Sequence, residues 1–257
     1  YDGKLYEKSL QELDFFTQKV NDNLDGVEEL SYAIAMDTEI QQQLSKIKSL
    51  NYHSAEYSYE MYQFRTLLLN ELNSHPMVKN ILYTDRNKTK ITVGVDCGTV
   101  DAGRYNRLLE QFREARGGYV VQAPTEKYPY LLAGRDVLKH LDASMDDLGS
   151  LMMTCDVSGM IEKKIDELEA NHSTLFVYSN DGMIYKEDKA EVPELPSVDQ
   201  TQGYRIIFYK GQKYFMCYLK SSKSGWMFVN IFPYSEIFGQ TMMVRYLMVA
   251  GFFIIFL

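Results

Sequence analysis

The segment Leu148-Gly-Ser-Leu-Met-Met-Thr-Cys-Asp-Val-Ser158 decides how this sequence is interpreted, because it joins a strand to a helix. Residues 148–156 are mostly apolar and end at Asp156, which is typical of a buried strand. A helix is expected over residues 159–168, leading away from that strand. We interpret this strand as the last one in a strand, strand, helix, three-strand series.

The residues before this segment supply the rest of the series. Strand-like alternation is found in four short runs, which are residues 78–84, 89–95, 119–123 and 128–133. The polar turn 85–88 separates the first two runs. A helix is expected over residues 105–115, and Gly117-Gly118 ends it. Strands at such short spacing are typical of an antiparallel sheet.

A second and smaller series follows. Five further runs have the pattern of strands: residues 173–178, 183–187, 204–209, 213–220 and 226–232. Glycine-containing turns, Asn180-Asp-Gly182 and Lys210-Gly-Gln212, connect two pairs of them. The two halves resemble each other in plan, although no repeat is visible residue by residue.

The first part of the chain is helical. Leu13, Val20, Val27 and Ile34 recur every seven residues, which predicts a long helix with one buried face. The pattern extends to residues 44–47, so one continuous helix is expected. A second helix is predicted over residues 57–72, before Pro76 prevents its continuation.

Composition and motifs exclude several functions. The formal net charge of −8 disfavours nucleic-acid binding, which depends on basic residues that neutralise phosphates. The four histidines lack ligand spacing, so no metal site is expected. Nucleotide-binding and serine-hydrolase signatures are absent, so we expect neither a cofactor nor enzymatic activity in this chain. Cys155 and Cys217 lie in apolar runs and are predicted to be core residues.

The last twelve residues, 246–257, are uninterruptedly apolar. A spanning helix needs about 20 such residues, so this run is expected to be the start of a transmembrane helix. Such a helix would attach the chain to a membrane.

The whole plan resembles the double Cache sensor domain, which consists of two PAS-like modules outside bacterial histidine kinases and chemoreceptors. The segment 148–158 resembles the closing strand of that family. Members that bind amino acids carry an Arg and aromatics after the first helix, a Pro-Tyr element and an Asp that ends the closing strand. Arg116 and Tyr119 lie near the first of these positions, Tyr130 follows Pro129 at the second, and Asp156 matches the third. The Arg-x-Trp pair of the family is replaced by Arg116-Gly-Gly-Tyr119.

These residues suit a small polar ligand. Arginine offers a fork of donors to carboxylate, aspartate accepts from ammonium or hydroxyl, and tyrosines form walls with polar tips. Tyr83 on the first strand is a further candidate wall. Structural roles compete: Asp156 could cap the following helix, Arg116 could be a solvated cation at a helix end, and Tyr119 and Tyr130 could be core aromatics.

The resemblance implies an α+β fold in which a long N-terminal helix precedes two PAS-like antiparallel-sheet modules and the start of a transmembrane helix. Four domains are expected: a helical entry (1–75), a membrane-distal ligand-binding module (76–170), a membrane-proximal module (171–233) and an exit segment (234–257). The implied function is the extracytoplasmic sensing region of a bacterial transmembrane receptor, such as a homodimeric histidine kinase located in the cell membrane.

In that role the chain binds a small polar metabolite of unknown identity and transmits a conformational signal across the membrane. The alternative is a dimerisation or partner-docking module with a vestigial pocket. It predicts that the apolar stripe from Leu13 to Ile34 is a seam between molecules rather than part of a core.

Overall fold

The computed structural model describes residues 2–142, 144–162, 173–186 and 200–235. The chain divides into two compact units. One is Val20–Met160, which we call the α4 unit after its helix α4 (Ala102–Ala115). The other, the terminal unit, combines Tyr1–Lys19 with Ile161–Leu257. The apolar run 246–257 lies outside the described residues. Among the helices that are described, none is both long and apolar enough to cross a membrane.

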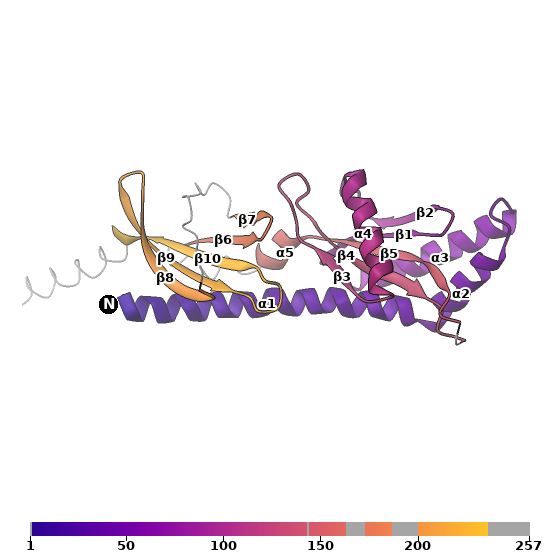
Figure 1. The fold of residues 1–257 in the computed structure, drawn as a ribbon, viewed down its shortest axis with the longest axis horizontal. Helices are drawn as coiled ribbons and strands as arrows, with labels where there is room; N and C mark the ends of the chain where they lie inside the picture. The colour runs from indigo at the N-terminus through magenta and orange to yellow at the C-terminus, as the bar shows by residue number, and fades with distance from the viewer. Residues whose placement is uncertain (1, 143, 163–172, 187–199, 236–257) are drawn as a thin grey trace, which may run out of the picture. The chain divides into compact units, whose positions relative to one another are not determined.

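Three helices open the chain (Figure 1): α1 (Asp2–Met36), α2 (Thr38–Ser49) and α3 (Ala55–Asn73). The prediction of one continuous helix up to residue 47 is wrong, because Asp37 is extended and separates α1 from α2. Its side chain accepts a hydrogen bond from the backbone nitrogen of Ile40 at 2.8 Å. This N-cap starts a new helix without interrupting the apolar pattern. Ser54 caps α3 in the same way, through Tyr57.

The apolar stripe of α1 is core. Leu13, Val20, Val27 and Ile34 are each 2% exposed or less within the single chain. Burial of such side chains is a main source of folding free energy. The stripe is therefore already covered, which differs from the exposed seam that the docking alternative requires.

The α4 unit contains an antiparallel sheet in the order β2-β1-β5-β4-β3. The strands are β1 (Val78–Thr84), β2 (Lys90–Gly94), β3 (Val120–Gln122), β4 (Leu131–Leu138) and β5 (Asp147–Cys155). The helix α4 (Ala102–Ala115) joins β2 to β3, and α5 (Val157–Glu162) follows β5. Strand β4 begins later than predicted, because Tyr128 forms only an isolated bridge to Thr125.

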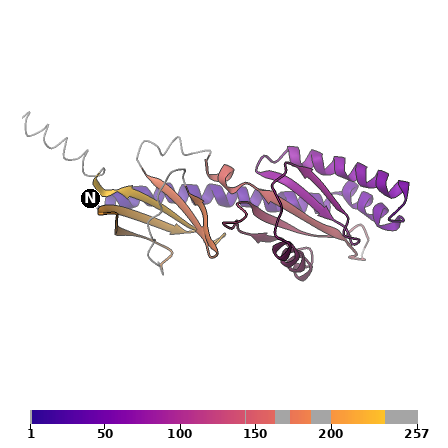
Figure 2. The ribbon, with the colours of Figure 1, turned by 90° about the horizontal axis from the view of Figure 1, so that it is seen from above.

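The two faces of this sheet have different coverings, which Figure 2 shows from above. Leu108 and Phe112 of α4 pack on one face, over Leu132 and Met152. Gly134 permits the close packing there, because an added Cβ would lie 1.9 Å from the carbonyl oxygen of Leu151 and 3.0 Å from Phe112.

The opposite face meets the first helices. The ring of Tyr83 lies 4.8 Å from that of Phe64 on α3. The guanidinium of Arg135 donates to the hydroxyl of Ser31 on α1 at 2.9 Å. Tyr83, Leu151 and Arg135 are register partners, so they share this face.

The terminal unit contains a second antiparallel sheet in the order β7-β6-β10-β9-β8. Its strands are β6 (Thr174–Ser179), β7 (Gly182–Lys186), β8 (Gln202–Tyr209), β9 (Gln212–Lys220) and β10 (Met227–Pro233). Phe176, Met216 and Val229 are among the buried residues of one of its hydrophobic clusters. A long helix followed by two five-stranded antiparallel sheets confirms the predicted α+β class.

Candidate ligand site

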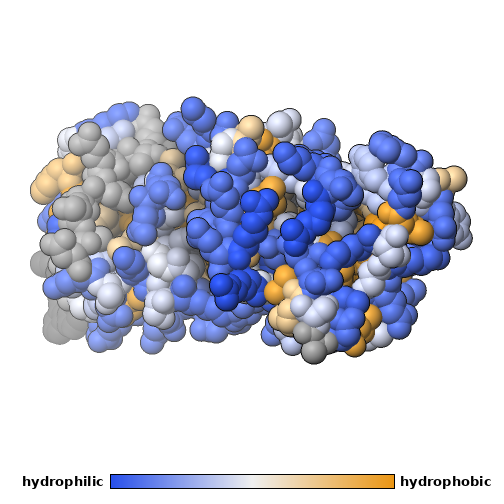
Figure 3. Space-filling model, turned by 45° about the vertical axis from the view of Figure 1, so that its right-hand side comes forward, coloured by the Kyte–Doolittle hydropathy of each residue, from blue (hydrophilic) through white to orange (hydrophobic). Residues whose placement is uncertain are grey.

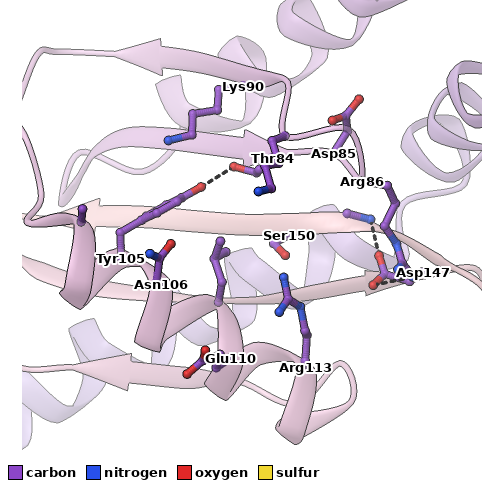
Figure 4. A pocket seen from close by; sticks show the side chains of 14 residues that line it. Thr84, Asp85, Arg86, Lys90, Tyr105, Asn106, Glu110, Arg113, Asp147 and Ser150 are labelled. Carbon is purple, nitrogen blue, oxygen red and sulfur yellow. Dashed lines mark hydrogen bonds and ion pairs between the residues drawn. The ribbon is translucent and has the colours of Figure 1, made fainter. Parts of the chain in front are cut away.

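A cavity of about 580 Å³ opens between α4 and the strands β1, β2 and β5 (Figure 4). We call it the α4 cleft. Its side chains come from three separate parts of the chain: the β1–β2 turn with the strand residues beside it, one side of α4, and the start of β5. The lining includes Thr84, Arg86, Lys90, Tyr105, Arg113 and Ser150.

The helix α4 presents two rows of residues because of its period. Asp101 starts the helix by accepting a hydrogen bond from the backbone nitrogen of Arg104 at 3.0 Å. Leu108 and Phe112, four residues apart, are buried against the sheet. Tyr105, Leu109 and the more exposed Arg113 follow the neighbouring row and line the cleft.

A hydroxyl pair crosses the cleft. The Thr84 hydroxyl on β1 and the Tyr105 hydroxyl on α4 are hydrogen-bonded at 2.7 Å. The ammonium of Lys90 lies 4.2 Å from the centre of the Tyr105 ring, which is a cation–π geometry. A ligand entering here would meet two hydroxyls and a cation within one small area.

The start of β5 is fixed by an ion pair. Arg86 approaches the carboxylate of Asp147 at 2.8 Å, and the same carboxylate accepts from the backbone nitrogen of Gly149 at 2.7 Å. Gly149 has a φ of +128°, and a Cβ there would lie 2.7 Å from the Tyr83 ring. Glycine is therefore required at this position.

The β1–β2 turn is fixed by Asp85. Its carboxylate accepts from the Tyr57 hydroxyl and from the backbone nitrogen of Thr89, each at 2.7 Å. Burial raises the pKa of Tyr57 to about 12, and the hydrogen bond to Asp85 acts in the same direction. The hydroxyl therefore stays protonated and connects the turn to α3.

A buried carboxyl group lies behind the cleft. Ser150 donates a hydrogen bond to Asp136 at 2.6 Å. Burial raises the pKa of Asp136, while the hydrogen bond from Ser150 opposes that rise. Thr84, Ser150 and Asp136 are register partners and so lie on the face that α4 covers.

The sequence-predicted residues are not brought together. Tyr83 lies on the sheet face opposite α4, where its hydroxyl donates to the carbonyl oxygen of Leu148. Arg116 is exposed at the end of α4 in the left-handed conformation, with a φ of 48°. Tyr119 is directed toward Arg135, whose guanidinium carbon lies 5.8 Å from the centre of its ring.

The remaining two lie toward the other end of β5 from the cleft. Asp156 accepts from the backbone nitrogen of Gly159 at 3.1 Å, as the N-cap of α5, and lies 3.9 Å from the ammonium of Lys79. The Tyr130 ring packs edge-on against Tyr128, with 5.5 Å between the ring centres. None of the five predicted residues lines the α4 cleft.

Sequence reasoning missed the residues that do line the cleft. The segment 85–88 was interpreted only as a polar turn, and Arg113 only as part of a helix. The signal that could have found them is the concentration of Arg86, Lys88 and Lys90 at a turn beside a helix with further basic residues. Among residues with a described placement, no group of three His, Cys, Asp or Glu side chains could hold a metal ion.

Comparison with known proteins identifies the class of fold. The sensor histidine kinase YesM of Bacillus subtilis is 22% identical over 247 residues, which are 93% of this chain and 42% of YesM. The chain therefore spans less than half of that relative. No family model matches the sequence.

Solved structures of sensor domains share the fold, and three illustrate the similarity. The ligand-binding domain of the Campylobacter jejuni chemoreceptor Tlp3, in complex with 4-methylisoleucine, has a TM-score of 0.55 and 13% identity, and the match covers 91% of this chain and 94% of that one. The ligand-binding domain of the Pseudomonas fluorescens chemoreceptor CtaA, in complex with L-alanine, has a TM-score of 0.60 and 12% identity. That match covers 91% of this chain and 99% of the CtaA domain. The extracellular domain of the histidine kinase vpHK1S-Z8 has a TM-score of 0.60 and 12% identity, and the match covers 90% of this chain and 95% of that domain. The resemblance to Cache-type sensor domains is thus confirmed for the fold.

Proposed function

We propose that this chain is the extracytoplasmic sensing region of a bacterial transmembrane signalling receptor, and that a small polar metabolite binds in its α4 cleft. The fold shared with chemoreceptor ligand-binding domains supports a sensor role. The relation to YesM supports a histidine kinase as the rest of the protein. Membrane attachment through residues 246–257 and a homodimeric receptor belong to the same proposal.

The observation that carries the proposal is the α4 cleft itself. Its volume of about 580 Å³ falls in the range of small-molecule sites. Polar side chains from three segments converge on it around the apolar wall of Tyr105 and Leu109. Such a combination of an apolar wall with a few placed polar groups is typical of ligand pockets.

The contacts around the cleft provide a way to transmit binding. A ligand held between α4 and the β1–β2 turn would favour one separation of these two segments over another. The turn is hydrogen-bonded to α3 through Asp85 and Tyr57. A ligand shifts such an equilibrium only by its difference in affinity for the two states.

A thermal-shift screen tests the proposal. The chain would be screened against amino acids, organic acids, sugar phosphates, sugars and purines, together with two matched variants on α4. Asn106→Trp fills the cleft, whereas Arg107→Trp adds the same side chain at an exposed position that does not line it. One class of compound should raise the melting temperature of the wild type and Arg107→Trp but not that of Asn106→Trp.

Two outcomes would contradict this site. If no class stabilises the folded wild type, the sensor proposal loses its basis. If the response persists in Asn106→Trp but disappears in Tyr130→Ala and Asp156→Ala, the ligand binds toward the other end of β5, where the resemblance placed it.

Docking to a protein partner is the second candidate function, and one observation favours it. Tyr59, Tyr62 and Leu69 of α3 are 60%, 63% and 37% exposed. On the face seen in Figure 3, however, the coloured residues are mainly hydrophilic and the apolar areas are small and separate. Small separate areas of this kind are ordinary for soluble surfaces. A fall in the solution mass of the chain from dimer to monomer, on replacing both tyrosines with serine, would support docking of a second copy through α3.

A further inference from the structure

The acidic and basic residues around the α4 cleft differ in how many contacts they already make. The lining contains the acidic residues Asp85, Glu110 and Asp147, and four basic residues. The basic ones are Arg86, Lys88, Lys90 and Arg113. Which charges remain available for a ligand depends on the contacts that each group already makes.

Two of the three acidic groups that line the cleft already have partners. Asp147 accepts from Arg86 and from the backbone of Gly149. Asp85 accepts from Tyr57 and Thr89, one at each carboxylate oxygen. Only Glu110 remains, and in Figure 4 its exposed carboxylate points away from Thr84 and Ser150.

The basic groups are less engaged, although Arg113 interacts electrostatically with the buried Asp136 behind Ser150. Within the described part of the chain, no ion pair involves Lys88, Lys90 or Arg113. Figure 4 shows the Arg113 guanidinium directed toward Ser150, while Lys90 lies on the other side of Thr84. Lys90 comes from β2 and Arg113 from α4, so the two cations approach the cleft from different walls.

We infer that the α4 cleft takes a small anion, with its carboxylate or phosphate group held between Lys90 and Arg113. The inference rests on the proposed sensor function and specifies the chemistry of its ligand. The guanidinium supplies a planar fork of donors that matches the oxygens of either group, and the lysine supplies a point charge. The hydrogen-bonded Thr84–Tyr105 hydroxyl pair adds one neutral O–H donor beside them, because the other hydrogen of the pair lies in the bond between the two residues.

The same contacts disfavour a zwitterion. The ammonium group of an amino acid needs an acceptor, preferably a carboxylate, to offset its lost hydration. In the cleft, the carboxylates of Asp85 and Asp147 already have partners, and Glu110 is directed elsewhere. A ligand without an ammonium group is therefore bound more tightly than an amino acid of similar size.

Isothermal titration calorimetry with the whole chain tests this inference. The probes are inorganic phosphate, glycerol 3-phosphate, succinate and citrate as anions, L-alanine as a zwitterion, and glucose as a neutral compound. At least one anion should bind, and its affinity should fall as salt increases. Arg113→Gln and Lys90→Gln should each weaken that binding by about tenfold to a hundredfold.

Arg107→Gln is the matched control, since it removes a cation from α4 outside the cleft and should leave the affinity unchanged. Circular dichroism would show that each variant is folded. Binding by phosphates alone or by carboxylates alone identifies which group the cleft takes, and either result supports the inference.

Two results would overturn the inference, and they have different consequences for the proposed function. Tight binding of L-alanine or glucose that Asn106→Trp abolishes and Arg113→Gln does not would refute an anion site while leaving the sensor function intact. Failure of every probe and of the wider metabolite screen to bind the folded wild type would remove both.

Discussion

Replacing Tyr83 with phenylalanine separates a structural role from a role in ligand binding. Tyr83 is 1% exposed, and its hydroxyl donates to the carbonyl oxygen of Leu148 on the sheet face opposite α4. The phenylalanine ring would keep the edge-on contact with Phe64, whose ring centre lies 4.8 Å away. The change therefore removes one buried hydrogen bond and little packing.

The expected loss of stability follows from that bond. A carbonyl left buried without its donor costs about 1–3 kcal/mol. For a chain of this size, each kcal/mol lowers the melting temperature by about 2–4 °C. Ligand affinity should stay unchanged, because the removed hydroxyl does not reach the α4 cleft.

Urea unfolding followed by circular dichroism would measure the free energy, and calorimetry with the anion that binds the wild type would measure affinity. Tyr62→Phe is the control, since Tyr62 is exposed on α3 and should change neither quantity. The reasoning is refuted if Tyr83→Phe lowers ligand affinity while leaving the free energy of unfolding as it was, which would restore Tyr83 as a wall of the binding site.

Three further predictions concern the cysteines, a buried carboxyl and the first helix. Under native conditions a thiol reagent should label only Cys97, which is partly exposed, because Cys155 and Cys217 are buried in the core. Rapid labelling of two or three thiols would contradict the described core. Burial raises the pKa of Asp136 in the folded state above its ordinary value of 3.8. At pH values above 3.8 the folded state therefore binds more protons at this carboxyl than the unfolded state does, and its contribution to the free energy of unfolding falls as the pH rises. Asp136→Asn should remove that decline, which urea unfolding from pH 4 upward would detect, and an identical pH profile in the variant would exclude Asp136 as its source. Val27→Glu should lower the free energy of unfolding by several kcal/mol and unfold the chain, whereas Ala33→Glu on the exposed face of α1 should not. Circular dichroism together with solution mass would distinguish an unfolded chain from a folded one that has only lost a dimer contact.

Periodicity made most of the fold predictable. The heptad stripe of α1 and the alternation of the strands are direct consequences of how side chains are spaced in helices and sheets. The break at Asp37 was missed because Ile34 and Ile40 continue the apolar pattern across it. Only the cap geometry of Asp37 divides the helix, and cap geometry depends on backbone angles that the pattern does not contain.

The site was less predictable, because it depends on which face of a strand a residue occupies. Tyr83 and Thr84 are neighbours in sequence and lie on opposite faces of β1. The sequence indicates that the faces alternate, but it does not show which one α4 covers. Arg116 was selected by resemblance alone, and its competing interpretation as a helix-end cation agrees with its exposed position after α4.

Hydrogen–deuterium exchange of the chain, with and without a saturating concentration of the anion that binds it, tests whether the α4 cleft is the sensing site. Binding in the α4 cleft should slow exchange in peptides that cover residues 84–90 and 102–113. Peptides from β8 and β9 of the terminal unit, residues 202–220, should change far less. If protection appears only in β8 and β9, or if residues 84–90 and 102–113 exchange as fast with ligand as without it, the α4 cleft is not the sensing site.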